Sequence, residues 1–437
     1  MRVSRPNRRY QTALWIDRWV GPPLCALLLG SSKLASVLRP GRRLASLPPL
    51  PPLDRVEKIL VLKMWGMGSI VLAAPMLRRL RERHPEARID FLSLRENERI
   101  LQLLPDVDRI VGLDLGRGIP AFLWRTFLTI RELRRERYDL LYDLEFFTRF
   151  SAILSFIAAP VRSHGFSAKG KWRGRLQDVE VPFNAYHHVA ANFLTLLRSD
   201  PMEPVDETEI SGDAALPKLQ ASEEAWQRCL EAIEGDPNGH SWRDGAPIVV
   251  VNPNAGDMAL ERRWPRERAA AFLKHLDAEG RANVVVSGSP AERVYAESVV
   301  SACGAGTNIL NLAGRIDIPE LVALLSHAQV VVTNDSGPLH LAAASGASTV
   351  ALFGPETPTL YGPLRSRAGQ QHEIHYRRLA CSPCMFIHDN KVLSCWFAQA
   401  RCMMGIQSAD VLASVNRLLA GVPGLGSEEP RQRAGDS

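Results

Sequence analysis

The stretch VVVTNDSGPLHLAAASGASTVALFGP, residues 330–355, decides which fold class the sequence indicates. Its β-branched start, residues 330–333, is typical of a buried strand, and the alanine-rich segment after the polar cluster 334–337 is typical of a helix. Pro338 at the first helical position and Gly346 just past the last one mark the ends of that helix. A strand that leads through a polar turn into a helix is the repeating unit of a parallel α/β sheet.

The same unit recurs in both halves of the chain. In the first half, KILVLKM precedes the glycine-bearing turn WGMGS and a helical stretch, and RIDFLSL, DRIVGLDL and YDLLYDLEFF supply further strands. In the second half, a series of strands and helices runs from APIVVVNPNAG to QVVVTND. We therefore expect an α/β protein with two doubly wound, Rossmann-like domains.

The expected domain limits follow shifts in composition. Residues 54–199 are expected to form an N-terminal Rossmann-like domain, and residues 246–420 a C-terminal one. Residues 200–245, rich in Asp, Glu, Pro, Gly and Ser, are expected to connect them. Residues 1–53 form a basic, amphipathic arm that ends in the spacer LPPLPPL, and residues 421–437 are expected to be disordered.

The positive charge of the chain is concentrated at its N-terminus. The formal net charge is +6, yet residues 1–50 hold nine Lys/Arg and one Asp, so the remainder carries −2. Binding to nucleic acid needs a basic body with interleaved aromatic side chains. The near-neutral body therefore argues against nucleic acid as a partner.

The N-terminal arm predicts contact with a membrane surface. Arginines surround Trp15 and Trp19, and the apolar run 20–30 is too short to cross a bilayer. Asp17 and Arg18 interrupt the apolar character, which disfavours a signal peptide. We expect a peripheral anchor on the inner face of the cytoplasmic membrane, and the alternative is a helix that packs on the protein itself. The seven cysteines, an odd number, indicate a reducing, cytoplasmic setting.

The polar cluster after residue 333 is a candidate phosphate-binding turn. Ser336 and Gly337 stand where the helix begins, so their backbone N–H groups can bind an anion, and Gly337 lets a phosphate approach closely. Asp335 would repel a phosphate, and it is expected to accept hydrogen bonds from sugar hydroxyls. Ordinary helix capping is the alternative for Asp335 and Ser336, but the additional polar residues and His340 favour a ligand site.

Two further loops follow strands and point to the same region. The loop NPNAGDMALERRWP carries Arg262 and Arg263, which suit a pyrophosphate, and SGSPAE places Glu292 where a ribose hydroxyl could bind. The alternatives are a solvated arginine face and a first-turn acid favoured by the helix dipole. Because the carboxyl ends of parallel strands meet at one edge, we expect these loops to converge.

At these residues the sequence resembles the heptosyltransferase family (glycosyltransferase family 9), with the motifs NDSGPLHLAAASGASTVALFGP, RRWP, GSPAE and KILVLKMWGMGSIVLAAPMLRRLRERHP, over residues 58–416. The resemblance implies the GT-B architecture, in which two Rossmann-like domains face each other across a cleft. It implies inverting transfer of a heptose or related sugar from an ADP-heptose-like donor to a lipid-linked or lipopolysaccharide-type acceptor.

The resemblance also implies roles for individual residues: Arg262 on a phosphate, Glu292 on the ribose, Ser336 and Gly337 on the pyrophosphate, and Asp335 on the transferred sugar. No DxD-type carboxylate pair stands where it could hold a metal on the donor. Arginine and helix N-termini can supply that charge stabilisation, so no obligatory metal or cofactor is expected.

The general base is the point at which this chain departs from the family. The family has an aspartate after the glycine of the first loop, whereas this chain has Ser69, which cannot act as that base at neutral pH and could simply cap a helix. Asp143 and Glu145 share one face of a strand, and His187 and His188 titrate in a useful range. Among these candidates we favour Glu145.

The departure at Ser69 keeps two other functions open. One is a non-catalytic sugar-nucleotide-binding or scaffolding protein of the same fold, and the other is an epimerase or hydrolase that acts on the nucleotide-sugar itself.

Near the C-terminus, four cysteines in CSPCMFIHDNKVLSCWFAQARC could bind zinc, form a disulfide or stay reduced and buried. In each case we expect their role to be structural.

Overall fold

The computed structural model describes residues 15–38, 56–115, 118–168, 171–198, 203–256, 259–385 and 395–421. Within these residues the strands form two six-stranded sheets, in the orders β3-β2-β1-β4-β5-β6 and β12-β11-β10-β7-β8-β9. Every neighbouring pair of strands is parallel. The order is the same in both sheets when each is counted from its own first strand, so the expectation of two doubly wound domains is confirmed.

The first domain contains β1 (Lys58–Leu62), β2 (Arg88–Leu94), β3 (Arg109–Leu113), β4 (Leu140–Asp143), β5 (Arg162–Ser167) and β6 (Val179–Pro182). Its helices are α3 (Met67–Val71), α4 (Ala74–Arg83), α5 (Glu98–Leu101), α6 (Ile119–Glu136), α7 (Arg149–Ala158) and α8 (Val189–Thr195). Helices α6 and α7 contact each other, as do α4 and α8.

The second domain contains β7 (Ile248–Asn252), β8 (Asn283–Val286), β9 (Ile309–Asn311), β10 (Val330–Asn334), β11 (Ser348–Phe353) and β12 (His372–Tyr376). Its helices are α10 (Arg266–Ala278), α11 (Arg293–Ser301), α12 (Ile318–His327), α13 (Gly337–Ser345), α14 (Pro358–Tyr361), α15 (Arg401–Met404) and α16 (Ser408–Ala420). Helix α9 (Glu223–Glu234), from the segment between the domains, packs on α12.

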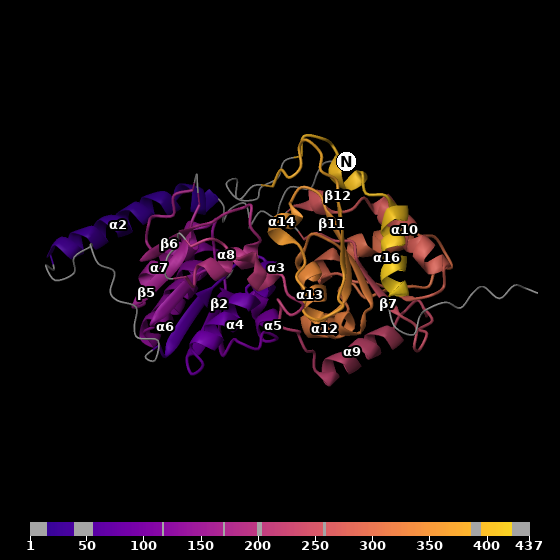
Figure 1. Ribbon diagram of the computed structural model, residues 1–437, viewed down its shortest axis with the longest axis horizontal. Helices are drawn as coiled ribbons and strands as arrows, with labels where there is room; N and C mark the ends of the chain where they lie inside the picture. Colours follow the sequence, from indigo (N-terminus) through magenta and orange to yellow (C-terminus); the bar gives the residue numbers. More distant parts are fainter. Residues whose placement is uncertain are drawn as a thin grey trace, which may run out of the picture.

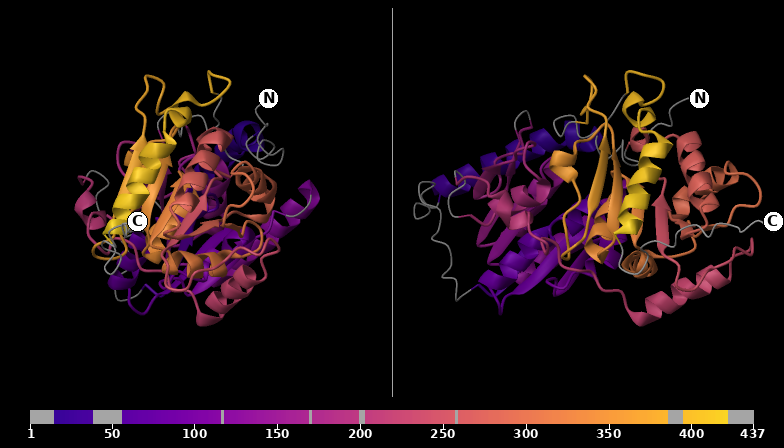
Figure 2. Two further views of the ribbon diagram at one scale, coloured as in Figure 1. Left: turned by 90° about the vertical axis from the view of Figure 1, so that its right-hand side faces the viewer. Right: turned by 45° about the vertical axis from the view of Figure 1, so that its right-hand side comes forward.

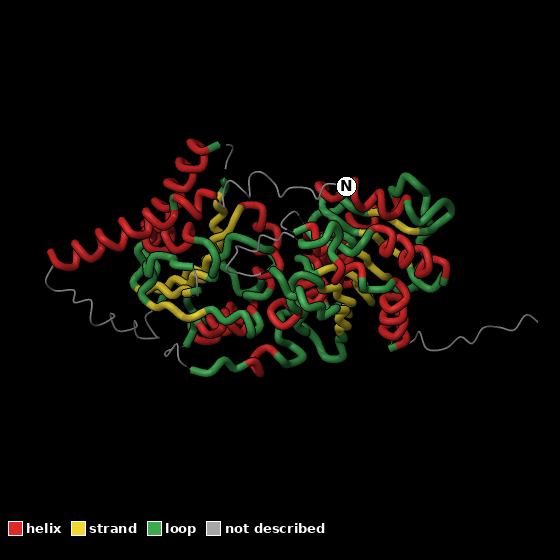
Figure 3. The backbone as a smooth tube through the Cα atoms, turned by 90° about the horizontal axis from the view of Figure 1, so that it is seen from above, coloured by secondary structure: helices red, strands yellow, loops and turns green. Residues whose placement is uncertain are grey.

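The two sheets lie side by side along the long axis of the molecule, each between layers of helices (Figures 1 and 2). Seen from above, strands alternate with helices in both halves (Figure 3). Strand β10 is buried over its whole length because helices cover both faces of its sheet, which explains its continuous apolar sequence. The helix after it begins at Gly337 and is followed by Gly346 in the left-handed conformation, as Pro338 and Gly346 predict.

The N-terminal helix α2 (Gly21–Leu38) packs on α7 of the first domain. Asp17, just before it, accepts hydrogen bonds from the backbone N–H groups of Arg149 and Phe150, at 2.6 and 3.2 Å, and so caps α7. Cys25 is fully buried. The described part of the arm therefore packs on the protein, the alternative raised above, and no helix among the described residues is long and apolar enough to span a membrane.

Several expectations fall outside the described residues. These are the first part of the arm, residues 1–14, the proline-rich spacer within residues 39–55, and residues 422–437, where disorder was expected. The strands of the two sheets lie between residues 54 and 199 and between residues 246 and 420, respectively.

Candidate active site

A cleft of about 790 Å³ lies between the two domains, at the carboxyl ends of their central strands. The first domain lines it with the loop 63–69, Arg99 and Phe147, and the second domain lines it with the loops that follow β7, β8, β9 and β10. The predicted site residues that line this cleft are Ser69, Arg262, Glu292, Asp335, Ser336, Gly337 and His340. The loops therefore converge as the strand-end rule requires.

The N-terminus of α13 opens into the cleft. Ser336 is its N-cap residue, but its hydroxyl makes no capping hydrogen bond to the helix and lies instead 3.2 Å from the carbonyl oxygen of Asn334. Side-chain capping, the alternative for Ser336, is thus absent from this helix. The first backbone N–H groups of α13 are available to an anion, and the helix dipole favours negative charge there.

Arg262 is held beside this helix terminus. Its Nη1 donates to the carbonyl oxygen of Asp335 at 2.8 Å and lies 3.5 Å from Asp335 Oδ2, and its Nη2 donates to the carbonyl oxygen of Ala255 at 2.8 Å. Asn334 ties the same loops together, because its side chain accepts from the N–H of Trp264 and donates to the carbonyl oxygen of Pro253. A fixed cation next to free helical N–H groups is a strong site for a phosphate or pyrophosphate.

Glu292 has a structural role in the same cleft. Its Oε2 accepts from the N–H and hydroxyl of Ser289, at 2.9 and 2.8 Å, in a capping box, and its Oε1 accepts from the N–H of Gly256 at 3.2 Å. The carboxylate therefore joins the loops after β7 and β8. Glu292 is thus a first-turn acid, the alternative considered above, and it also lines the cleft.

The two domains touch where α3 packs on α13. A Cβ atom added at Gly68 would lie 2.5 Å from His340 Cδ2, and one added at Gly337 would lie 2.5 Å from Met67 Cε. At Gly68 the added atom would meet the buried ring of His340, so glycine lets the two helices approach this closely there, whereas at Gly337 the flexible end of Met67 could move aside. Ser69 follows Gly68 directly, and α3 begins without a side-chain capping hydrogen bond, so Ser69 does not cap it.

His340 is buried at this contact between the domains. Burial lowers the pKa of His340 to about 3, so the imidazole is neutral at physiological pH. Its Nδ1 has no hydrogen-bond partner in the described part of the chain. The residue therefore presents an uncharged ring to the turn that carries Ser69, and it cannot act as a cation for the donor phosphates.

Glu145 does not line the cleft, and its geometry argues against a general base. Its side chain is fully buried, and Oε1 accepts from Lys63 Nζ at 2.8 Å and from the backbone N–H groups of Met64 and Trp65, both at 2.9 Å. A carboxylate that makes an ion pair with a lysine and also accepts two backbone hydrogen bonds positions the loop 63–69. Asp143 is equally enclosed, beside Arg173 and Gln177.

The two histidines considered with Glu145 lie away from the cleft. His188 caps α8 through Nδ1, which accepts from the N–H of Ala190, and its Nε2 donates to the carbonyl oxygen of Gly362. Burial lowers the pKa of His188 to about 4. His187 forms a pair with Glu207 at 3.0 Å. Both histidines thus have structural partners.

The cleft also contains residues that the sequence did not single out. Arg99 of the first domain lies 4.0 Å from Asp317 of the second, and Arg315 is anchored by Asp236 at 3.1 Å. Asp317 and Glu320 form a capping box at the start of α12, a motif legible in the sequence. Nothing local could have identified Arg99, because its approach depends on how the two domains meet.

The four C-terminal cysteines line one small cavity of about 20 Å³. Their thiols are unpaired, and burial raises the pKa of Cys384 to about 11, which keeps it protonated at neutral pH. Among the described residues no group of three or more His, Cys, Asp or Glu side chains is arranged to hold a metal ion. Cys402 is buried and the other three are half-buried, and the choice among zinc, a disulfide and reduced thiols stays a prediction.

Comparison with known proteins gives a consistent picture. The sequence model of glycosyltransferase family 9 (heptosyltransferase) matches residues 127–389, more than half of the chain. Lipopolysaccharide heptosyltransferase 2 of Escherichia coli K12 is 28% identical over 315 residues, which cover 71% of this chain and 86% of that protein.

Two solved structures share the fold. A glycosyl transferase of family 9 from Veillonella parvula matches with a TM-score of 0.66 and 20% identity, over 85% of this chain and 99% of its own. An Escherichia coli heptosyltransferase solved with ADP matches with a TM-score of 0.58 and 16% identity, over 83% of this chain and 99% of its own. The GT-B expectation is confirmed, and the chain belongs to glycosyltransferase family 9, the heptosyltransferases, and is a glycosyltransferase.

Proposed function

We propose that this enzyme transfers a heptose or a related sugar, with inversion, from an ADP-heptose-like donor to a lipid-linked or lipopolysaccharide-type acceptor. The observation that carries the proposal is the pairing of Arg262 with the uncapped N-terminus of α13 in the cleft between the domains. The relatives support the choice of donor and acceptor, since one is named a lipopolysaccharide heptosyltransferase and another was solved with ADP.

The donor is bound mainly by the second domain. Arg262 and the N–H groups of Ser336 and Gly337 bind the pyrophosphate, Glu292 accepts hydrogen bonds from the ribose, and Asp335 accepts them from the transferred sugar. Arg262 and these two N–H groups stabilise the negative charge that develops on the leaving nucleoside diphosphate. Because this charge stabilisation comes from an arginine and a helix terminus, the reaction proposed here requires no metal.

The acceptor enters from the first domain. Ser69, at the α3–α13 contact, hydrogen-bonds the attacking hydroxyl, and Glu145 holds the loop that carries Ser69 through Met64 and Trp65. The described carboxylates that line the cleft, Glu292, Asp317, Glu320 and Asp335, all belong to the second domain. Glu145 thus acts as a positioning residue in the proposed mechanism.

The acceptor is expected at the inner face of the cytoplasmic membrane. Trp15 and Trp19 of the arm are each 60% exposed although the helix that follows them packs on the first domain. Exposed tryptophans beside arginines are typical of a peripheral membrane contact. The arm would then hold the enzyme near its lipid-linked substrate.

Calorimetric titration of the full chain with ADP, UDP, GDP and CMP tests the donor site. We expect ADP to bind, and we expect Arg262→Ala and Glu292→Ala each to weaken binding about 10- to 100-fold, as for a lost charge-assisted hydrogen bond. Arg266→Ala, which removes an exposed arginine near the cleft loop, is the matched control and should bind normally. If no nucleotide binds, the proposed donor site is wrong.

Product analysis separates transfer from the two other reactions. The purified enzyme is incubated with the nucleotide-sugar with and without acceptor, and products are followed by mass spectrometry. Transfer predicts a glycosylated acceptor and little turnover without it. Equal consumption of donor in both samples would instead indicate an epimerase or a hydrolase.

A further inference from the structure

Helix α6 exposes an apolar stripe that no described part of the protein covers. Leu123, Trp124, Phe127 and Leu128 are 59%, 60%, 53% and 42% exposed. The rings of Trp124 and Phe127 stack with their centroids 5.7 Å apart. At 3.6 residues per turn these four positions fall on one side of the helix, so they form a continuous patch.

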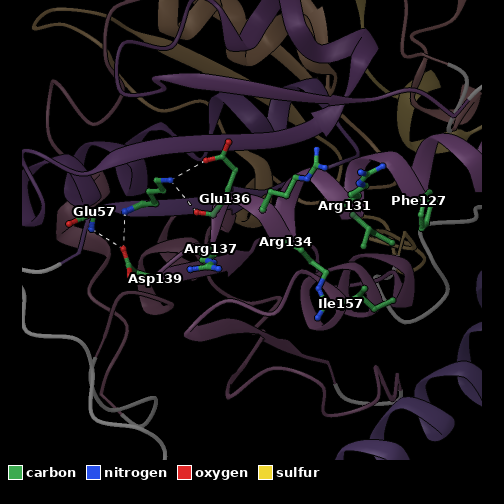
Figure 4. Close-up of a pocket in the computed structure, with 11 residues that line it drawn as sticks. Glu57, Phe127, Arg131, Arg134, Glu136, Arg137, Asp139 and Ile157 are labelled. Atoms are coloured by element: carbon green, nitrogen blue, oxygen red, sulfur yellow. Dashed lines mark hydrogen bonds and ion pairs between the residues drawn. The ribbon is translucent and has the colours of Figure 1, made fainter.

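The same side of α6 becomes basic toward its C-terminal end. Arg131, Arg134, Arg135 and Arg137 line a surface cavity of about 1000 Å³ that begins at Phe127. Figure 4 shows Phe127, Arg131, Arg134 and Arg137 following one another along it. The helix thus presents an aromatic half and a cationic half on a single exposed side.

These arginines differ from the others nearby in having no carboxylate partner. Arg88 and Arg109 both make ion pairs with Glu136, at 2.6 Å in each case, and Arg125 makes one with Asp114. In the described part of the chain, no carboxylate lies within ion-pair distance of the four cavity arginines. Three acids also line the cavity: Glu136, which those ion pairs engage, Asp139, which accepts the backbone N–H groups of Glu57 and Lys58, and Glu57 itself. Because the lining holds five cations, the four arginines and Lys58, against three acids, it keeps a net formal charge of +2.

The patch and the N-terminal arm both lie on the first domain, around α7. Both α6 and α2 pack on α7, and Figure 1 shows the three helices at the end of the molecule away from the second domain. Phe150 in the first turn of α7 contacts both, since its ring lies 5.6 Å from that of Phe122 and its N–H donates to Asp17. The arm and α6 are therefore neighbours of the same helix.

We propose that the exposed side of α6, here called the membrane face, docks on an anionic phospholipid surface, with the α6 arginines on the lipid phosphates and Trp124 and Phe127 in the headgroup region. Charge complementarity selects this occupant, because four unpaired arginines beside stacked aromatic rings match phosphates above an apolar layer. The proposal adds α6 to the membrane contact of the arm and rests on the proposed lipid-linked acceptor.

Sedimentation with vesicles tests the proposal. The full chain is mixed with vesicles of phosphatidylglycerol and phosphatidylethanolamine, or of phosphatidylcholine alone. We expect binding only to the anionic vesicles, weakened by salt. Arg131→Glu/Arg134→Glu/Arg135→Glu should weaken it about 100-fold or more, and Trp124→Ser/Phe127→Ser should weaken it about tenfold or more.

Matched controls come from the second domain. Arg281→Glu reverses another exposed arginine, and Val294→Ser removes a side chain that is 78% exposed, and both should bind like the wild type. Normal binding by both α6 variants, or equal binding of the wild type to phosphatidylcholine, would overturn the proposal. If the wild-type chain binds none of the vesicles and elutes as a dimer, the face serves self-association instead.

ADP titration keeps this proposal separate from the proposed function. The α6 variants that lose the vesicles should bind ADP like the wild type, because α6 does not line the cleft. Vesicle binding without ADP binding in the wild type would contradict the donor site and leave the membrane face standing. The reverse result would contradict the membrane face alone.

Discussion

The loops after β4 and β10 occupy equivalent places in the two domains, but the first carries a buried carboxylate and the second carries one that lines the cleft. Each strand lies between the first and fifth strands of its own sheet, and each is followed by a segment that carries a carboxylate, Glu145 after β4 and Asp335 after β10. After β4, Glu145 is sealed inside its domain with Lys63, and the side chains of this pair are 0% and 1% exposed. After β10, Asp335 and Ser336 line the cleft between the domains.

The difference lies in what the neighbouring segments offer. Lys63, at the end of the adjacent strand β1, provides Glu145 with a cation, and the next two residues provide two N–H groups. Among the described residues the Asp335 carboxylate is approached by Arg262 alone, 3.5 Å from its Oδ2, and it lines the cleft. Glu145 Oε2 also has no hydrogen-bond partner among the described residues, but it is buried away from the cleft. Access to the cleft therefore distinguishes the two carboxylates.

The largest effect on stability is expected when the buried ion pair between Glu145 and Lys63 is removed. Glu145→Gln removes the carboxylate that pairs with the buried Lys63 ammonium, which should lower the free energy of unfolding by about 3–5 kcal/mol in urea denaturation. Asp213→Asn in an exposed ion pair with Arg365 is the control and should cost less than about 1 kcal/mol. A stable Glu145→Gln protein would show that this ion pair does not hold the fold, and a changed pH profile of its transferase activity would restore Glu145 as the general base.

The second effect is expected at Asp335 in the cleft, and it concerns the catalytic rate rather than the stability of the fold. Asp335→Asn should lower kcat about 100-fold, as for other lost transition-state contacts, and change the free energy of unfolding by less than about 1 kcal/mol. Asp410→Asn, in an exposed pair with Arg377 on the same domain, serves as the control for both measurements. An unchanged kcat would show that Asp335 does not contact the substrate, and Asp335 would then be a structural carboxylate like Glu145.

The smallest effect concerns His340, in the helix that begins after Ser336, and it is a change in how stability depends on pH. Burial lowers the pKa of His340 in the folded chain to about 3, against a model-peptide value of about 6.5. Between these values the unfolded chain binds a proton that the folded chain does not, so the free energy of unfolding falls as pH falls below 6.5. Each such histidine contributes up to about 1.4 kcal/mol per pH unit.

Urea denaturation at pH 7, 6 and 5 measures that slope. His340→Asn should make the loss of stability with acid shallower by the share of one proton, while His188 and His372, whose pKa values burial lowers to about 4, keep the rest. If the slope were the same in the variant, His340 would be protonated inside the folded chain, and the contact between α3 and α13 would be wetter than its burial indicates.

Much of this architecture was determined by the sequence alone. The alternation of β-branched runs, polar turns and amphipathic helices indicated both sheets, and Pro338 and Gly346 marked the helix between them. The convergence of Arg262, Glu292 and Ser336 on one cleft followed from the rule that parallel strands end at one edge. These features depend on residues close together in the chain, because periodicity and turn chemistry are local.

Only the tertiary structure decided which polar residues are satisfied. Glu145 meets a lysine 82 positions away, Asp17 caps a helix 132 positions away, and Arg99 faces Asp317 across the cleft. None of these approaches leaves a signal in the sequence around either partner. Burial and ion pairing arise from the packing of distant segments, and this packing determines whether a carboxylate stabilises the fold or remains free to bind a substrate.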